Sequence, residues 1–203
     1  MKFALPILVL ILSGCHSLNP ASPNRSLHGV DIRQPTTQEQ VEIFDKAISQ
    51  LPPAVIKSIK SFTARGDDEA DHFDGSSIGH CSWDRHICLL NKYYSESSIW
   101  HEASHAYHFY LNKIGSDFID CWKMAAGSPI KGAVSHYGTT NYREDIAEWY
   151  EEVQRFLQGQ HSIFAHFAYR DLLKTNPIYR RKFELLKVYG FITAEQHDRI
   201  LTF

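Results

Sequence analysis

The five residues His101-Glu102-Ala103-Ser104-His105 constrain the fold of this chain more than any other segment. Residues four apart lie on one face of an α-helix, so both imidazoles can reach a single zinc ion, with Glu102 beside its open position. No Gly or Pro interrupts 99–111, and the serines at 95, 97 and 98 can cap a helix. We therefore predict a helix over 97–113 that carries His101 and His105 as metal ligands. The alternative is that both histidines are ordinary polar positions of an amphipathic helix.

A second segment, 137–148, offers the carboxylate and hydroxyl groups that the first one lacks. Glu144 can supply a third ligand, and Glu148 lies one turn later on the same helix face. There it could accept the free N–H of a ligating histidine. The spacing leaves alternatives open, because Asn141 to Glu144 also has the form of a capping box. Asp145 or Glu148 could also be the ligand in place of Glu144.

Two other classes of metal site do not fit the sequence. The metzincin pattern needs Gly at 108 and His at 111, where this chain has His108 and Leu111. A di-iron bundle needs two Glu-x-x-His pairs, and only Glu102/His105 qualifies among the core helices. We expect His108 to be a hydrogen-bonded core histidine and His136 to be a loop residue that could contact substrate.

Together the two segments resemble the catalytic domain of anthrax lethal factor and related secreted bacterial zinc peptidases, over roughly 90–157. The resemblance implies one Zn²⁺ per chain and a protein or peptide substrate. It implies that Glu144 is the third ligand, that Glu148 supports a histidine and that Tyr137 faces the substrate carbonyl. Glu102 would be the general base. By analogy to zinc peptidases in general, we expect the substrate to add as a strand to an edge strand near 87–91.

The N-terminus has the pattern of a secretory signal. Met1-Lys2 is followed by an apolar run over 3–12 and by Ser13-Gly14-Cys15. The run is too short to span a bilayer. Residues 12–15 resemble the bacterial lipobox, which would make Cys15 the lipid-modified first residue, and a plain signal peptide is the alternative. By the same resemblance, His16 favours an outer-membrane location.

These features predict three parts: a signal peptide over 1–14, a lipid-anchored tether over 15–35 and one metallopeptidase-like domain over 36–203. The partners would be the substrate and, through acylated Cys15, a lipid bilayer of the bacterial cell envelope. A net charge of −2 gives no sign of nucleic-acid binding. We expect a monomer.

The predicted fold class is α+β, mostly helical, with a small sheet. Strand propensity favours 86–90, and 66–82 is acidic and glycine-bearing, as a long loop would be. Further helices are expected near 41–51, 115–126, 141–157, 161–174, 178–188 and 194–201. The basic residues Arg170, Arg180, Arg181 and Lys182 suggest a solvated face. Cys81 and Cys88 could form a disulfide across a hairpin, which would leave Cys121 unpaired.

Two other functions remain open from the sequence alone. The first is a lipoprotein that binds zinc without catalysis, although such a protein would need neither Glu102 nor Tyr137. The second is an amidase that cleaves cell-wall peptide bonds with the same zinc chemistry.

Overall fold

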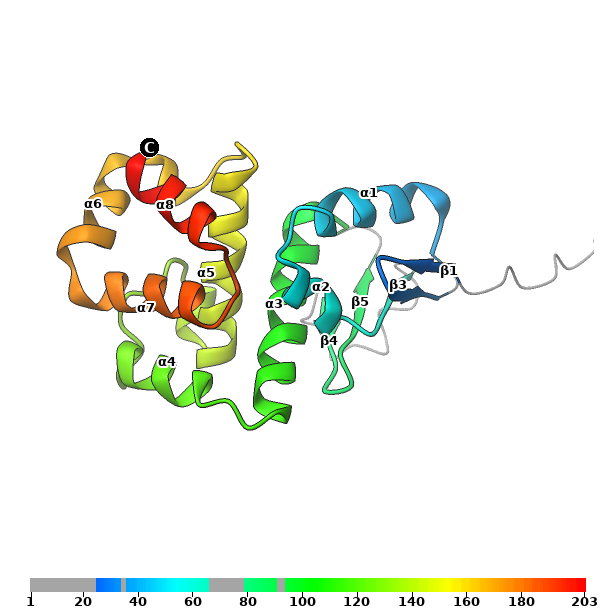
Figure 1. Cartoon of the computed structure of the whole chain (residues 1–203), viewed down its shortest axis with the longest axis horizontal. Helices are drawn as coiled ribbons and strands as arrows, with labels where there is room; N and C mark the ends of the chain where they lie inside the picture. The colour runs from blue at the N-terminus through cyan, green and yellow to red at the C-terminus, as the bar shows by residue number, and fades with distance from the viewer. Residues whose placement is uncertain (1–24, 34–35, 66–78, 91–93) are drawn as a thin grey trace, which may run out of the picture.

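The computed structural model describes residues 25–33, 36–65, 79–90 and 94–203. The predicted signal peptide, Cys15 and the first part of the tether lie outside the described residues. The chain folds into a mostly helical α+β structure with a five-stranded mixed sheet (Figure 1). The predicted fold class is therefore confirmed. None of the described helices is both long and apolar enough to cross a membrane.

The strands of the sheet are β1 (Arg25–Leu27), β2 (Val30–Ile32), β3 (Ser61–Arg65), β4 (Gly79–Cys81) and β5 (His86–Leu90). Their spatial order is β1-β2-β3-β5-β4; β3 is parallel to both β2 and β5, whereas β1/β2 and β4/β5 are antiparallel. Residues 25–32 were expected to belong to the tether, but they form β1 and β2. The side chains of Val30 and Ile32 are buried in the hydrophobic core, whereas the side chains of a tether would be exposed to solvent.

The β4–β5 hairpin corrects two expectations at the other side of the sheet. Residues 79–81 fall in the predicted loop, yet they form β4 by pairing with β5. The strand near 87–91 was expected at an edge, but β5 lies between β3 and β4. Among the described strands, β4 is therefore the edge on this side.

The three described cysteines, Cys81, Cys88 and Cys121, are free thiols. Cys81 lies opposite Ile87 in the hairpin, and Cys88 lies opposite His80. Because neighbouring residues of a strand point to opposite faces, Cys81 and Cys88 project to different sides of the sheet. The disulfide that the sequence allowed is not formed for this reason.

The helices expected from the sequence occur in the predicted order with shifted ends, and the structure adds the short helix α2. The α-helices are α1 (Gln38–Ile48), α2 (Pro53–Ser58), α3 (Glu96–Lys113), α4 (Phe118–Ala126), α5 (Tyr142–Leu157), α6 (Phe167–Thr175), α7 (Pro177–Val188) and α8 (Ala194–Thr202). Two 3-10 turns, η3 (Tyr137–Thr139) and η4 (Ile163–Ala165), precede α5 and α6, so the helix expected over 161–174 begins later. Thr193 and Gln196 form a capping box at the start of α8.

Helix α3 lies between the two halves of the molecule. The sheet with α1 and α2 is on one side of it, and α5 with α4, α6, α7 and α8 is on the other (Figure 1). The fully buried Trp100 fixes α3 to α1, because its indole N–H donates to the carbonyl of Ala47 at 3.0 Å. On the opposite half, the Tyr107 hydroxyl donates to the carbonyl of Tyr189 at 2.8 Å. The helix that carries the histidines is thus held from both sides.

Lys182 does not lie on a solvated face. Its ammonium group is fully buried and contacts Asp145, also fully buried, at 2.6 Å. The same ammonium donates to the carbonyls of Lys131 and Gly132, and Asp145 also accepts a hydrogen bond from the Trp122 indole. The sequence did not indicate this contact, because Lys182 follows two other basic residues and looked like part of the same exposed cluster. The contact joins α7 to the first turn of α5.

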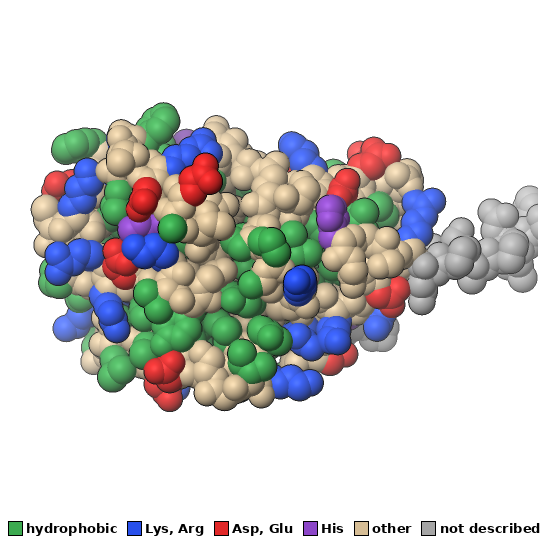
Figure 2. Space-filling model, in the orientation of Figure 1, with side chains coloured by type: hydrophobic (Ala, Val, Ile, Leu, Met, Phe, Trp, Pro, Cys, Tyr) green, Lys and Arg blue, Asp and Glu red, His purple; other side chains and the backbone are tan. Residues whose placement is uncertain are grey.

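Charged side chains of both signs lie on the face of the molecule seen in Figure 2. On the face seen in Figure 2, basic and acidic groups occur over both halves of the molecule, with hydrophobic side chains between them. This mixture agrees with the small net charge of −2. On this face, a charged ligand would therefore find local contacts rather than a broad field of one sign.

Candidate metal centre

Helix α3 presents His101 and His105 on its face toward α5. Ser95 caps the helix, with its hydroxyl accepting from the backbone N–H of Ser98 at 3.2 Å. The two imidazole rings lie one turn apart, with centroids separated by 5.0 Å. The first sequence prediction is therefore confirmed in its geometry: two histidines project side by side from one helix.

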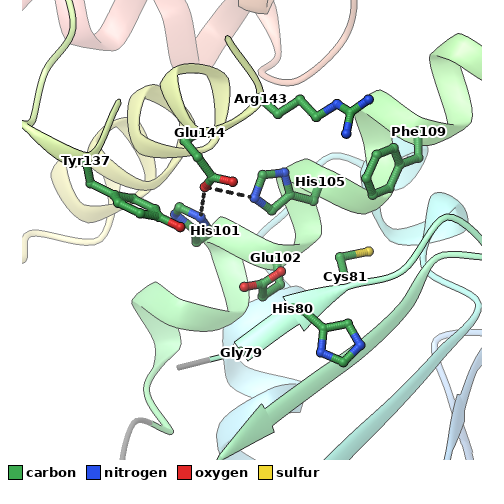
Figure 3. A pocket seen from close by; sticks show the side chains of 10 residues that line it. All are labelled: Gly79, His80, Cys81, His101, Glu102, His105, Phe109, Tyr137, Arg143 and Glu144. Carbon is green, nitrogen blue, oxygen red and sulfur yellow. Dashed lines mark hydrogen bonds and ion pairs between the residues drawn. The ribbon is translucent and has the colours of Figure 1, made fainter. Parts of the chain in front are cut away.

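Helix α5 brings the third group. Its N-cap is Asn141, whose side chain accepts from the backbone N–H groups of Arg143 and Glu144 at 2.9 and 3.2 Å. The Glu144 carboxylate is therefore not used for capping. It points instead at α3, and its Oε2 lies 3.1 Å from Nε2 of His101 and 3.3 Å from Nε2 of His105. Figure 3 shows both contacts.

His101, His105 and Glu144 thus form a candidate metal site. One ligand atom from each lies within 4.8 Å of the others. Among the alternatives that the sequence left open, Asp145 is excluded as a ligand because it is buried against Lys182. Glu148 faces the other nitrogen of His101, so it does not replace Glu144.

Two carboxylates support His101 from behind. Its Nδ1 lies 3.2 Å from Glu148 Oε1 and 3.3 Å from Glu151 Oε2. Glu148 therefore lies beside a candidate ligand histidine, and its supporting role stays a prediction. Glu151 was not foreseen, although it follows Glu148 at a spacing of three on the same helix, which placed it within reach. Acceptors of this kind fix which imidazole nitrogen carries the proton and leave the other nitrogen free for a metal.

His105 has a different environment. Its Nδ1 is buried and has no hydrogen-bond partner among the described residues. The neighbouring His108 is buried as expected, with its ring centroid 5.2 Å from that of His105, but neither of its nitrogens has a partner in the described part of the chain. Burial lowers the pKa of His108 well below its ordinary value, which keeps it neutral.

The charges of the site favour an ionised Glu144. Burial alone would raise the pKa of Glu144, but hydrogen bonds from His101 and His105 outweigh it and lower this pKa. For His101, burial would lower the pKa, and the contacts with Glu144, Glu148 and Glu151 raise it well above the ordinary value. The raised pKa of His101 favours a positive charge beside Glu144.

The three groups open onto a cleft of about 170 Å³ that also contains Glu102 and Tyr137. Glu102 is 5% exposed, and its Oε2 has no hydrogen-bond partner in the described residues. Burial raises the pKa of Glu102. Tyr137 lies across the cleft on η3, 55% exposed, with its ring centroid 6.1 Å from that of His101. Burial and the nearby Glu144 raise the pKa of Tyr137, so its hydroxyl keeps its proton and can donate.

The remaining walls of the cleft come from β4 and from one end of the α3–α5 contact. Gly79, His80 and Cys81 line it from β4, and Phe109 and Arg143 close the end beyond His105 (Figure 3). No sequence pattern indicated that β4 or Arg143 would line the cleft, because the positions of both depend on contacts between distant segments. His136 is exposed and is not among the residues that line the cleft.

Comparison with known proteins adds no relative to this description. No protein family, no curated protein and no solved structure matches the chain. The candidate metal centre therefore rests on its own geometry: two histidines and a glutamate converge on one point, in a mixed α+β fold, beside a buried glutamate and a tyrosine.

Proposed function

We propose that this protein is a zinc-dependent peptidase. One observation carries the proposal: Glu102 and Tyr137 line the same cleft as the trio of His101, His105 and Glu144. Zinc bonds of about 2.0–2.1 Å at tetrahedral angles separate ligand atoms by about 3.3–3.4 Å. The carboxylate oxygen of Glu144 already lies 3.1 and 3.3 Å from the two histidine nitrogens. These two spacings suit a tetrahedral zinc site, and the three ligand atoms all lie within 4.8 Å of one another.

When bound, zinc supplies Lewis-acid chemistry, which polarises a carbonyl and lowers the pKa of water. The chain's own residues then have separate roles. Glu102 accepts a proton from the attacking water and delivers it to the leaving amine. Its Oε2 is available for this role, because it has no hydrogen-bond partner in the described part of the chain. Tyr137 donates a hydrogen bond to the oxygen that becomes negative in the transition state. Glu148 and Glu151 hold His101 in the orientation that a metal requires.

The substrate would lie along β4. This short strand is the edge of the described sheet on the side of the cleft, and Gly79, His80 and Cys81 all line the cleft. An extended peptide can pair with such an edge through its backbone. The close approach of β4 to Glu102 depends on Gly79, where an added Cβ would lie 2.3 Å from Leu89 and 3.4 Å from Glu102.

The resemblance to the lethal factor catalytic domain supports the same assignment. In those peptidases a Tyr-Gly element precedes a helix with two glutamates four apart. Here Tyr137-Gly138 forms η3 directly before α5, and Glu144 and Glu148 contact the two nitrogens of His101. A zinc-binding protein without catalysis would need neither Glu102 nor Tyr137 in the cleft.

The variant Glu102→Gln tests the proposal most sharply. We expect the wild-type protein to cleave unstructured casein in a reaction that a chelator stops and zinc restores. Glu102→Gln should lower this rate by about a hundredfold or more, because general base catalysis contributes about 10²–10⁴-fold. Its zinc content should stay at the wild-type level, because Glu102 is not a ligand. Zinc binding without cleavage of casein or of a diverse peptide library would contradict the proposal.

A further inference from the structure

We infer that Arg143 forms a subsite for a carboxylate of the substrate, at the end of the cleft beyond His105. The inference rests on the proposed peptidase function and adds a substrate preference to it. The chemistry recognised is a carboxylate, which an Asp or Glu side chain or the C-terminus of a peptide can provide.

Three separate elements converge at this end of the cleft. The guanidinium carbon of Arg143, on α5, lies 4.7 Å from the ring centroid of Trp83 and 5.7 Å from that of Phe109. Trp83 belongs to the turn between β4 and β5, and Phe109 belongs to α3. The Trp83 and Phe109 rings are themselves 4.4 Å apart. Figure 3 shows Arg143 and Phe109 on the far side of His105 from Tyr137.

The guanidinium group has no acidic partner among the described residues. Among the described residues, Arg143 makes no side-chain hydrogen bond and no ion pair, and its contacts are the two aromatic faces. It is also the single Lys or Arg among the described residues that line the cleft, where Glu102 and Glu144 are acidic. Away from the metal ligands, Arg143 is therefore the group in this lining that can attract a carboxylate of the substrate, whereas Glu102 would repel one.

Stacking on aromatic rings suits an arginine that binds carboxylates. The rings hold the plane of the guanidinium, while its N–H groups, which lie in that plane, stay available. These groups form a fork that matches the two oxygens of a carboxylate. Trp83 is 60% exposed, so the ring that supports the arginine is also open to a bound ligand.

The test uses thiol peptides that bind zinc without needing turnover. One series carries a mercaptoacetyl group at the N-terminus and the other ends in a cysteamide, so that the peptide runs in either direction along the cleft. In each series, peptides with glutamate are compared with peptides with glutamine at each of the three positions nearest the thiol. The terminus that carries no thiol is blocked, so that it has no charge. A further set of mercaptoacetyl peptides has glutamine at these positions and an unblocked C-terminal carboxylate. Affinities are measured by calorimetry on the zinc-loaded full chain.

We expect a glutamate peptide, a free C-terminal carboxylate, or both to bind about tenfold more tightly than the blocked glutamine peptide, because a hydrogen bond between two charged groups is stronger than one to a neutral amide. The ligand that shows the preference identifies the source of the carboxylate. Arg143→Gln should abolish the preference, and Arg143→Glu should reverse it. Arg170→Gln is the matched control, because Arg170 also stacks on an aromatic ring, Phe203, but does not line the cleft.

The remaining outcomes separate the two claims. Equal binding of carboxylate and amide ligands in both series would overturn the inference and leave the peptidase proposal standing. Survival of the preference in Arg143→Gln, with the fold intact by circular dichroism, would also overturn it. Failure of every thiol peptide to bind, together with a lack of chelator-sensitive cleavage, would refute the peptidase function and this inference with it.

Discussion

At the scale of single residues, the most informative atom is Nδ1 of His101. It lies within 3.3 Å of carboxylate oxygens from both Glu148 and Glu151, whereas Nδ1 of His105 has no such partner among the described residues. The two histidines therefore differ in how firmly they are oriented. Because either carboxylate can accept the Nδ1 proton, each can partly replace the other.

This redundancy predicts a non-additive effect on zinc affinity. Glu148→Ala and Glu151→Ala should each weaken zinc binding by less than about tenfold, and the double variant by about 10–100-fold, the usual effect of losing such support. Competition with a fluorescent zinc chelator measures all three affinities.

The matched control is Arg155→Ala. It removes the contact of 2.7 Å between Arg155 and Glu151 but keeps both carboxylates beside His101. Its zinc affinity should equal that of the wild type. Additive losses in the two single variants, or an unchanged affinity in the double variant, would show that these carboxylates do not act together on His101.

The local pattern at 101–105 and the resemblance over 137–148 together indicated most residues of the site. Arg143 and the residues of β4 were missed because their place at the cleft depends on tertiary contacts. His101, Glu102 and His105 share one helix turn, so their spacing alone placed them together. Glu144 could not be separated from Asp145 by spacing, because only the burial of Asp145 against Lys182 decides between them. The position of Arg143 at the cleft could not be predicted, because it depends on the contact between α5, α3 and the β4–β5 turn.

At the scale of elements, the position of α5 depends on a buried ion pair. Asp145 is next to Glu144 in the first turn of α5, and it contacts Lys182 of α7 at 2.6 Å. The same aspartate accepts from the Trp122 indole of α4 at 2.8 Å. Three helices are therefore joined at the point where the chain presents Glu144 to α3.

Breaking this pair should destabilise the fold. Lys182→Met leaves the charge of Asp145 buried without its partner, which typically costs about 3–5 kcal/mol in the free energy of unfolding. The neighbouring Arg181 is exposed, so Arg181→Met should change this free energy by less than about 0.5 kcal/mol. Urea denaturation followed by circular dichroism measures both values.

A double variant separates the loss of a partner from the loss of side-chain contacts. Asp145→Leu combined with Lys182→Met removes both charges, so it should recover much of the stability that Lys182→Met loses. A cost for Lys182→Met no larger than that of Arg181→Met would show that the pair does not hold α5 in place.

The elements themselves were predictable where their signals are local. The helices carry caps and regular apolar spacing, as at Thr193 and Gln196, and they were found in order. The short strands β1, β2 and β4 have three residues each and lie in polar or glycine-bearing stretches. Their pairing comes from distant segments, as when Asp31 of β2 lies beside Ser61 of β3, and this is why the sequence indicated a tether and a loop instead.

At the scale of the whole molecule, the candidate metal centre joins two halves. His101 and His105 lie on α3, which packs against the sheet and against α1 and α2. Glu144 lies on α5, among the C-terminal helices (Figure 1). The site therefore exists only when α3 and α5 are packed together. A metal bound by both helices would stabilise this arrangement in proportion to its affinity for the folded protein.

The most direct test of the account is the zinc content of the purified full chain, measured by elemental analysis for the wild type and for Glu144→Ala. The account predicts about one zinc per wild-type chain. It predicts a large loss of zinc in Glu144→Ala, because a catalytic zinc ion is normally held by three protein ligands and the variant has two. A wild-type protein that is folded by circular dichroism, supplied with zinc and still free of metal would contradict the account. So would a Glu144→Ala variant that keeps its full zinc content.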